Sequence, residues 1–184
     1  EYPFPSAIED TIEIYNWILS QNFSPEKMCV GGVSAGGGLA LALLIFLKEN
    51  SISIPACSVL MSPWTDLSQS CDSYESKKMI DPVIKKEYLQ SWADDYLQGQ
   101  EFSNPLASPL FADLSGMPPS LIQVGSSEVM LGDSERIFDK SKLAGSPVEL
   151  EVWPEMFHGW QNNYDFLLES RQAVKNIGEF FKKN

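Results

Sequence analysis

The sequence predicts an α/β fold, in which a parallel sheet carries helices on both of its faces. Four short apolar runs have the length and the composition of buried strands. Segments in which apolar residues recur at helical spacing separate these runs. Alternation of strands and helices is typical of a parallel sheet. The strands are expected near 28–33, 57–62, 120–125 and 148–153.

The helices can be placed from capping signals and apolar spacing. Ser6 and Glu9 have the pattern of a capping box, and apolar residues follow it at Ile8, Ile12, Tyr15 and Leu19. Further helices are expected near 35–49, 133–144 and 165–182. Gly145 would end the second of these, near 133–144. The last helix would bury one apolar face, made of Phe166, Ala173, Val174, Ile177 and Phe181.

A chain of 184 residues can bury a substantial core, and one domain, 1–184, is the natural expectation. One stretch, from about 66 to 116, interrupts the alternation and is too long for a plain crossover. It is polar at first and then rich in large apolar side chains. A helical excursion that packs on its own aromatic residues would account for it. The large apolar side chains of this stretch are Tyr88, Trp92, Tyr96, Leu97, Phe102 and Phe111.

The net charge of −12 disfavours binding to nucleic acids, to anionic membrane surfaces and to acidic substrates. The three cysteines, Cys29, Cys57 and Cys71, are odd in number and lack C-x-x-C spacing, which indicates neither a zinc site nor a disulfide framework. A reduced cytoplasm is the simplest setting. The apolar run from Leu39 to Leu47 predicts a helix packed on all sides, and it is too short to span a bilayer. Association into a homo-oligomer stays open.

The most informative motif is Gly32-Val33-Ser34-Ala35-Gly36, which has the form G-x-S-x-G. It follows a predicted strand and precedes a predicted helix, which is the context of a nucleophile elbow. Glycine on both sides lets the backbone turn at little steric cost. The turn would lift the serine hydroxyl above the sheet edge and aim the following amides at the same point. An ordinary glycine-rich turn would have the same sequence.

A serine nucleophile of this kind needs an acid and then a histidine, in that order along the chain. The single histidine, His158, follows the last predicted strand, as this order requires. Two acids precede it, Glu128 and Asp133. Asp133 would lie one residue before a helix, where a carboxylate caps free amides and meets the positive end of the dipole. Glu128 has no comparable local role and is favoured as the acid.

Segments along nearly the whole chain share the motifs of one family. They are Tyr2 to Asp10, Gly32 to Gly38, Asn104 to Leu110, Gly116 to Pro119, and the residues around Glu128 and His158. Together they resemble the hormone-sensitive-lipase-like branch of the α/β-hydrolases, the bacterial carboxylesterases also called family IV lipases. Two positions depart from the usual pattern, since most members carry Asp or Thr at Val33 and many carry the acid at Ser127.

The resemblance implies an α/β-hydrolase fold and hydrolysis of short to medium acyl esters, with no cofactor and no metal. Ser34 would attack the ester carbonyl, His158 would take its proton, and Glu128 would orient the imidazole. The Ala35 amide would be an oxyanion donor. The resemblance also makes 66–116 the second part of a cap over the site.

Further consequences follow from the family pattern. Trp64 and Phe157 are expected to line the substrate pocket. The family's His-Gly-Gly-Gly loop, which supplies most of the oxyanion hole, is not in this sequence, which resembles the C-terminal three-fifths of a complete enzyme. Two alternatives to a carboxylesterase stay open. One is an inactive fragment, and the other is a ligand-binding protein on the same fold, such as the plant hormone receptors that have lost the histidine.

Overall fold

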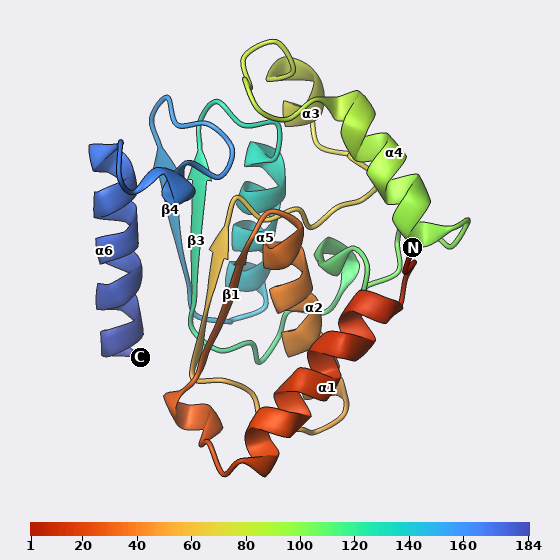
Figure 1. Cartoon of the computed structure of the whole chain (residues 1–184), viewed down its shortest axis with the longest axis vertical. Coiled ribbons are helices and arrows are strands. Elements are labelled where there is room, and N and C mark those ends of the chain that lie inside the picture. Colours follow the sequence, from red (N-terminus) through yellow and green to blue (C-terminus); the bar gives the residue numbers. More distant parts are fainter.

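The computed structural model describes residues 1–184 and contains one four-stranded sheet (Figure 1). All strand pairs are parallel, in the order β1-β2-β3-β4, so the carboxyl ends of the strands lie along one edge. The predicted strand positions are confirmed within a residue. The strands are β1 (Cys29–Val33), β2 (Cys57–Met61), β3 (Ser120–Gly125) and β4 (Val148–Trp153).

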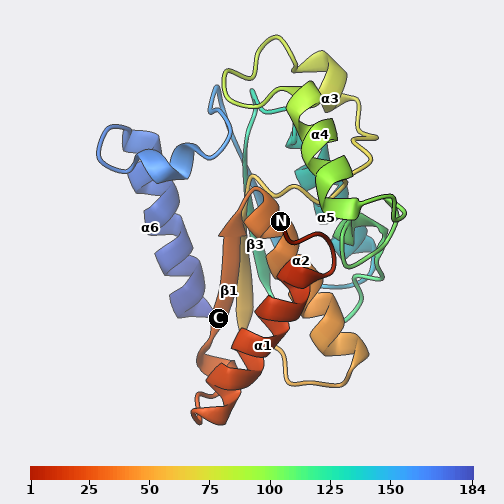
Figure 2. The same ribbon diagram turned by 45° about the vertical axis from the view of Figure 1, so that its right-hand side comes forward.

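Helices cover both faces of this sheet, as Figures 1 and 2 show. On one face, α2 (Ala35–Glu49) and α5 (Leu131–Leu143) pack on the strands, and α1 (Ser6–Ser20) packs against α2. On the opposite face lies α6 (Leu168–Lys183), which contacts β3. Three short 3₁₀ helices complete this part of the fold: η1 (Pro25–Lys27), η2 (Pro109–Phe111) and η3 (Trp160–Asn163).

The core is thickest around α2. This helix separates two apolar clusters, one shared with α1 and the segment after β2, the other shared with the sheet and α5. Leu44, Ile45 and Leu47 have no exposed surface, which confirms that the helix is packed on all sides. None of the helices combines the length and the hydropathy that spanning a membrane requires.

The segment between β2 and β3 is helical, as predicted. It holds α3 (Ser73–Ser76) and α4 (Lys86–Leu97), and both helices lie beyond the carboxyl edge of the sheet (Figures 1 and 2). Leu89, Ala93 and Leu97 of α4 are buried in the cluster that also contains residues of α1 and α2. The segment is therefore joined to the main core, and its role as a cap stays a prediction.

Two details of the predicted helices are wrong. Ser6 does not cap α1, because the helix begins at Ser6 itself and the carbonyl of Pro5 accepts the amides of Ile8 and Glu9. The predicted apolar face of the last helix is correct only for Ala173 and Ile177. Phe166 precedes the helix and is 86% exposed, and Val174 and Phe181 are exposed. The inward face runs through Ser170, Ala173, Ile177 and Phe180, of which Ile177 and Phe180 pack on apolar side chains of the sheet.

Candidate active site

Ser34 lies at the carboxyl end of β1, in the turn that leads directly into α2. Its backbone has φ 57° and ψ −122°, a conformation that non-glycine residues rarely adopt and that costs free energy. Gly32 permits the turn, because a Cβ there would lie 2.3 Å from the carbonyl of Gly36. Gly36 itself has open space around its Cα. The strain of the turn therefore falls on Ser34, and only the first glycine of the motif is required by close contact.

The first turn of α2 leaves free amides beside Ser34. Ala35 is the first residue of the helix, so its amide has no partner within α2, and no other backbone carbonyl accepts it. Two later amides, of Gly37 and Gly38, donate to the Ser34 carbonyl. Ser34 is half-buried, and the free amide of Ala35 lies directly beside it at the carboxyl edge of the sheet.

His158 and Glu128 form a buried pair at the same edge. Nδ1 of His158 lies 2.9 Å from Oε2 of Glu128, and both side chains are almost fully buried. Glu128 follows β3 in a tight turn, and its other oxygen, Oε1, accepts the Gly125 amide at 2.6 Å. Ser62, after β2, donates to this oxygen at 2.8 Å. The carboxylate thus accepts hydrogen bonds from two groups besides the imidazole, and no sequence motif marks either of them.

The histidine loop reaches the nucleophile turn. A Cβ on Gly159, the residue after His158, would lie 3.6 Å from Cγ1 of Val33, the residue before Ser34. The chain segments that carry the two residues therefore lie close together. The structure shows no hydrogen bond between the side chains of Ser34 and His158.

Asp133 does not cap a helix as predicted, because α5 begins two residues earlier, at Leu131. Its carboxylate is fully buried and accepts the amides of Thr65 and Asp66, at 2.8 and 2.9 Å, in the segment after β2. Cys71 donates a weaker contact from its thiol at 3.5 Å. Burial raises the pKa of Asp133 to about 6. The residue joins α5 to the segment after β2 and does not contact His158.

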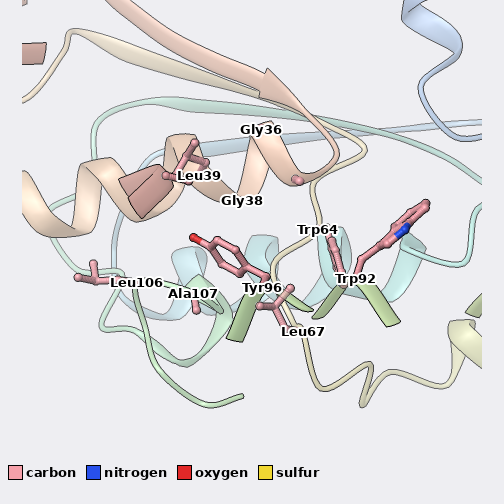
Figure 3. A pocket seen from close by; sticks show the side chains of 11 residues that line it. Gly36, Gly38, Leu39, Trp64, Leu67, Trp92, Tyr96, Leu106 and Ala107 are labelled. Carbon is pink, nitrogen blue, oxygen red and sulfur yellow. The ribbon is translucent and has the colours of Figure 1, made fainter. Parts of the chain in front are cut away.

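A pocket of about 390 Å³ adjoins the nucleophile turn (Figure 3). Its wall is mostly apolar, from α2 on one side and from the segment after β2 and α4 on the other. Of the two residues predicted for the substrate pocket, Trp64 lines this pocket, whereas Phe157 is half-buried and does not. The lining residues that lie between β2 and β3 are Trp64, Leu67, Trp92, Tyr96, Leu106 and Ala107.

Comparison with known proteins agrees with this fold. Residues 1–162 match a family of proteins with the alpha/beta hydrolase fold. The chain is 40% identical over 182 residues to an acetyl-hydrolase of Streptomyces hygroscopicus and 35% identical over 181 residues to an esterase of Acinetobacter venetianus. The aligned regions span 99% and 98% of this chain, but only 61% and 60% of the length of those proteins.

Solved structures give the same assignment. The chain superimposes on an esterase from the bacterial hormone-sensitive lipase family with a TM-score of 0.97 and 42% sequence identity, covering 99% of this chain and 61% of that one. The esterase EstE5, in a crystal soaked with p-nitrophenyl butyrate, has a TM-score of 0.96 and 39% identity, with the same coverage. The chain belongs to the α/β-hydrolase family, in its hormone-sensitive-lipase-like branch.

Proposed function

We propose that the protein containing this chain is a serine carboxylesterase with Ser34, His158 and Glu128 as its triad. The observation that carries the proposal is the buried hydrogen bond between His158 and Glu128 at the sheet edge where Ser34 stands in a strained turn. Between the two candidate acids, the contact of Glu128 with the imidazole supports Glu128, since the carboxylate of Asp133 is occupied by backbone amides.

The chemistry follows from the hydrogen bonds. A carboxylate that accepts a hydrogen bond from Nδ1–H of His158 leaves Nε2 of the imidazole as the acceptor for the proton of Ser34. Oγ of Ser34 then attacks the ester carbonyl carbon. The oxyanion of the tetrahedral intermediate accepts a hydrogen bond from the free Ala35 amide. Collapse expels the alcohol, which receives the proton from His158. Water activated by the same imidazole hydrolyses the acyl-enzyme.

The apolar pocket supports esters with a short to medium hydrocarbon group. It begins at Ala35 and Gly36, next to the nucleophile, and nearly all of its lining is apolar. Burial of each CH₂ group there would contribute about 0.8 kcal/mol of binding free energy. The named relatives are an acetyl-hydrolase and several esterases, which accords with substrates of this class.

Covalent labelling tests the nucleophile. A fluorophosphonate should label the full-length protein on Ser34, and Ser34→Ala should abolish both the labelling and the hydrolysis of p-nitrophenyl butyrate. Ser126→Ala is a matched control, because Ser126 lies near the site but its hydroxyl only accepts the Glu155 amide. Labelling that persists without Ser34 would show that another residue is the nucleophile. No labelling of the wild-type protein would favour a ligand-binding protein on the same fold.

A further inference from the structure

We infer that Ser62, which lies outside the proposed triad, is a positioning residue that fixes Glu128 and His158 relative to each other. The inference rests on the proposed function. Ser62 is the first residue after β2 and has no exposed surface. Its hydroxyl lies between the turn that carries the acid and the loop that carries the base.

The first contact orients the acid. Oε1 of Glu128 accepts the Ser62 hydroxyl at 2.8 Å and the Gly125 amide at 2.6 Å, which leaves Oε2 for Nδ1 of His158 at 2.9 Å. Two donors on one oxygen determine which oxygen faces the imidazole. Without the Ser62 hydroxyl, the Gly125 amide would be the one partner that holds the carboxylate independently of the imidazole. The Ser62 hydroxyl therefore supplies a second such point and fixes the plane of the carboxylate.

The second contact holds the base loop. The amide of Gly159, immediately after His158, donates to Oγ of Ser62 at 3.3 Å. A serine hydroxyl can donate one proton and accept others, so one side chain can serve both partners. The same oxygen atom therefore ties the acid to the backbone beside the base. Loss of the hydroxyl would loosen both contacts at once.

The segment around Ser62 also holds the nucleophile turn. The carbonyl of Met61 accepts the Ser34 amide at 2.9 Å, and the amide of Trp64 donates to the Ser34 carbonyl at 3.0 Å. The segment 61–64 thus contacts the nucleophile, the acid and the residue that follows the base. Within them, Ser62 is the residue whose side chain makes the contacts to the acid and to the base loop.

The backbone at Ser62 argues that the hydroxyl is the reason for a serine here. Its φ of 45° lies in the left-handed region, which glycine adopts at less cost. Its amide donates to the Gln123 carbonyl at 2.7 Å, a contact that any residue except proline would make. A purely conformational role would favour glycine. The side chain that is present instead uses both its donor and an acceptor position.

The test compares variants of the full-length protein. Ser62→Gly keeps the left-handed backbone and removes the hydroxyl, and Ser62→Ala removes the hydroxyl alone. Both should lower kcat for p-nitrophenyl butyrate by about 10- to 100-fold, because a small misplacement of catalytic groups has effects of this size. KM should change little, since Ser62 does not line the pocket. Ser58→Ala is the matched control, because Ser58 is an equally buried serine of β2 whose hydroxyl contacts Ser120.

A spectroscopic measurement separates positioning from general stability. The Nδ1 proton of an imidazole bonded to a buried carboxylate resonates far downfield of ordinary amide protons, and His158→Gln identifies the signal. It should weaken or shift in Ser62→Gly and Ser62→Ala, but not in Ser58→Ala. This measurement requires a folded protein and no turnover, so it remains informative even for an inactive protein.

The outcomes distinguish the two proposals. Wild-type kcat and an unchanged downfield signal in Ser62→Gly would overturn the role of Ser62, whether or not Ser34 is labelled. Loss of kcat and of the signal in both Ser62 variants, with Ser58→Ala unaffected, would support it. A wild-type protein that shows the Ser62-dependent signal but no reaction of Ser34 with a fluorophosphonate would contradict the proposed function and leave the positioning contact in place.

Discussion

At the scale of single residues, two buried carboxylates a few positions apart have different surroundings and therefore different proposed roles. Glu128 accepts one side-chain hydroxyl, one backbone amide and the imidazole. Asp133 accepts two backbone amides of the segment after β2. The first arrangement can orient a base. The second stabilises the loop on which Trp64 is carried.

Substitution of these two acids should have separable effects. Glu128→Ala should lower kcat by orders of magnitude, because an imidazole without its acid is a poorly oriented base. Asp133→Asn should instead change the pH dependence of stability. Esterase assays of both variants check whether the loss of kcat is confined to Glu128→Ala. A larger loss of kcat in Asp133→Asn than in Glu128→Ala would transfer the role of the acid to Asp133.

The direction of the pH effect follows from the raised pKa of Asp133, about 6 against an ordinary 3.8. Between these values the folded protein binds the proton more tightly than the unfolded chain does. The contribution of this carboxyl to the free energy of unfolding is therefore present below pH 3.8 and is lost as the pH rises to about 6, by about 3 kcal/mol.

Denaturant unfolding of the wild-type protein and of Asp133→Asn, measured from pH 4 to pH 7, checks this expectation. The difference in free energy of unfolding, wild type minus variant, should fall as the pH rises. The variant removes this one titration, so other carboxylates cancel in the difference. A difference that stays constant or rises over this range would show that burial does not govern the protonation of Asp133.

Sequence patterns predicted the residues of the site that local motifs mark, but not those whose partners are distant. Ser34 stands in a recognisable turn, and the order acid then histidine singled out Glu128 and His158 as candidates. Ser62 is 66 residues from Glu128 and 97 residues from Gly159 along the chain, so only the folded sheet brings them together. The one local signal was its position at the carboxyl end of a strand. Asp133 was assigned to a cap because distant backbone amides are invisible in a sequence.

At the scale of elements, the packing of α2 depends on close approach to the segment after β2. A Cβ on Gly38 would lie 2.2 Å from the carbonyl oxygen of Trp64, a backbone atom that cannot move aside. Gly38 therefore lets α2 approach the residues that also hold Ser34 and Asp133. In contrast, Gly178 within α6 has open space around its Cα, so no contact requires a glycine there.

Substitution of these two glycines by alanine should consequently change the free energy of unfolding in opposite directions. Gly178→Ala should raise the free energy of unfolding by up to about 1 kcal/mol, because alanine favours a helix over glycine. Gly38→Ala should lower it and reduce esterase activity, because α2 must move away from Trp64. Thermal or denaturant unfolding of both variants checks the signs. A neutral or stabilising Gly38→Ala would mean that the segment after β2 can shift at no cost.

The predicted helices and strands were most accurate where a regular pattern of apolar residues is bounded by residues typical of turns. The four strands are short apolar runs bounded by turn residues, and Gly145 ends α5 with φ 76°. The face of α6 was misjudged because spacing alone allows two neighbouring apolar stripes on one helix. Contact with Leu121 and Cys57 of the sheet selects the stripe that contains Phe180. The partner surface, and not the helix, decides which stripe is buried.

At the scale of the whole molecule, the sheet is unequally protected along its order. β1 lies at one end and is hydrogen-bonded only to β2, so its outer edge has unpaired backbone groups within these residues. Cys29 and Gly31 of this strand are exposed. On the α6 side, Val174 and Phe181 are exposed as well. Open strand edges and exposed apolar groups are both typical sites of association between chains.

Residues 1–184 expressed alone should therefore associate, and their esterase activity should lie near background. Size-exclusion chromatography with light scattering measures the association, and the full-length protein is the reference. Cys29→Lys should reduce association, because a charge on an edge strand opposes pairing with another edge. Ser103→Lys adds the same charge at an exposed site between β2 and β3 and should have no such effect. A monomeric, cooperatively melting 184-residue chain with the turnover of the full-length protein would show that neither the edge of β1 nor additional oxyanion donors limit this fold.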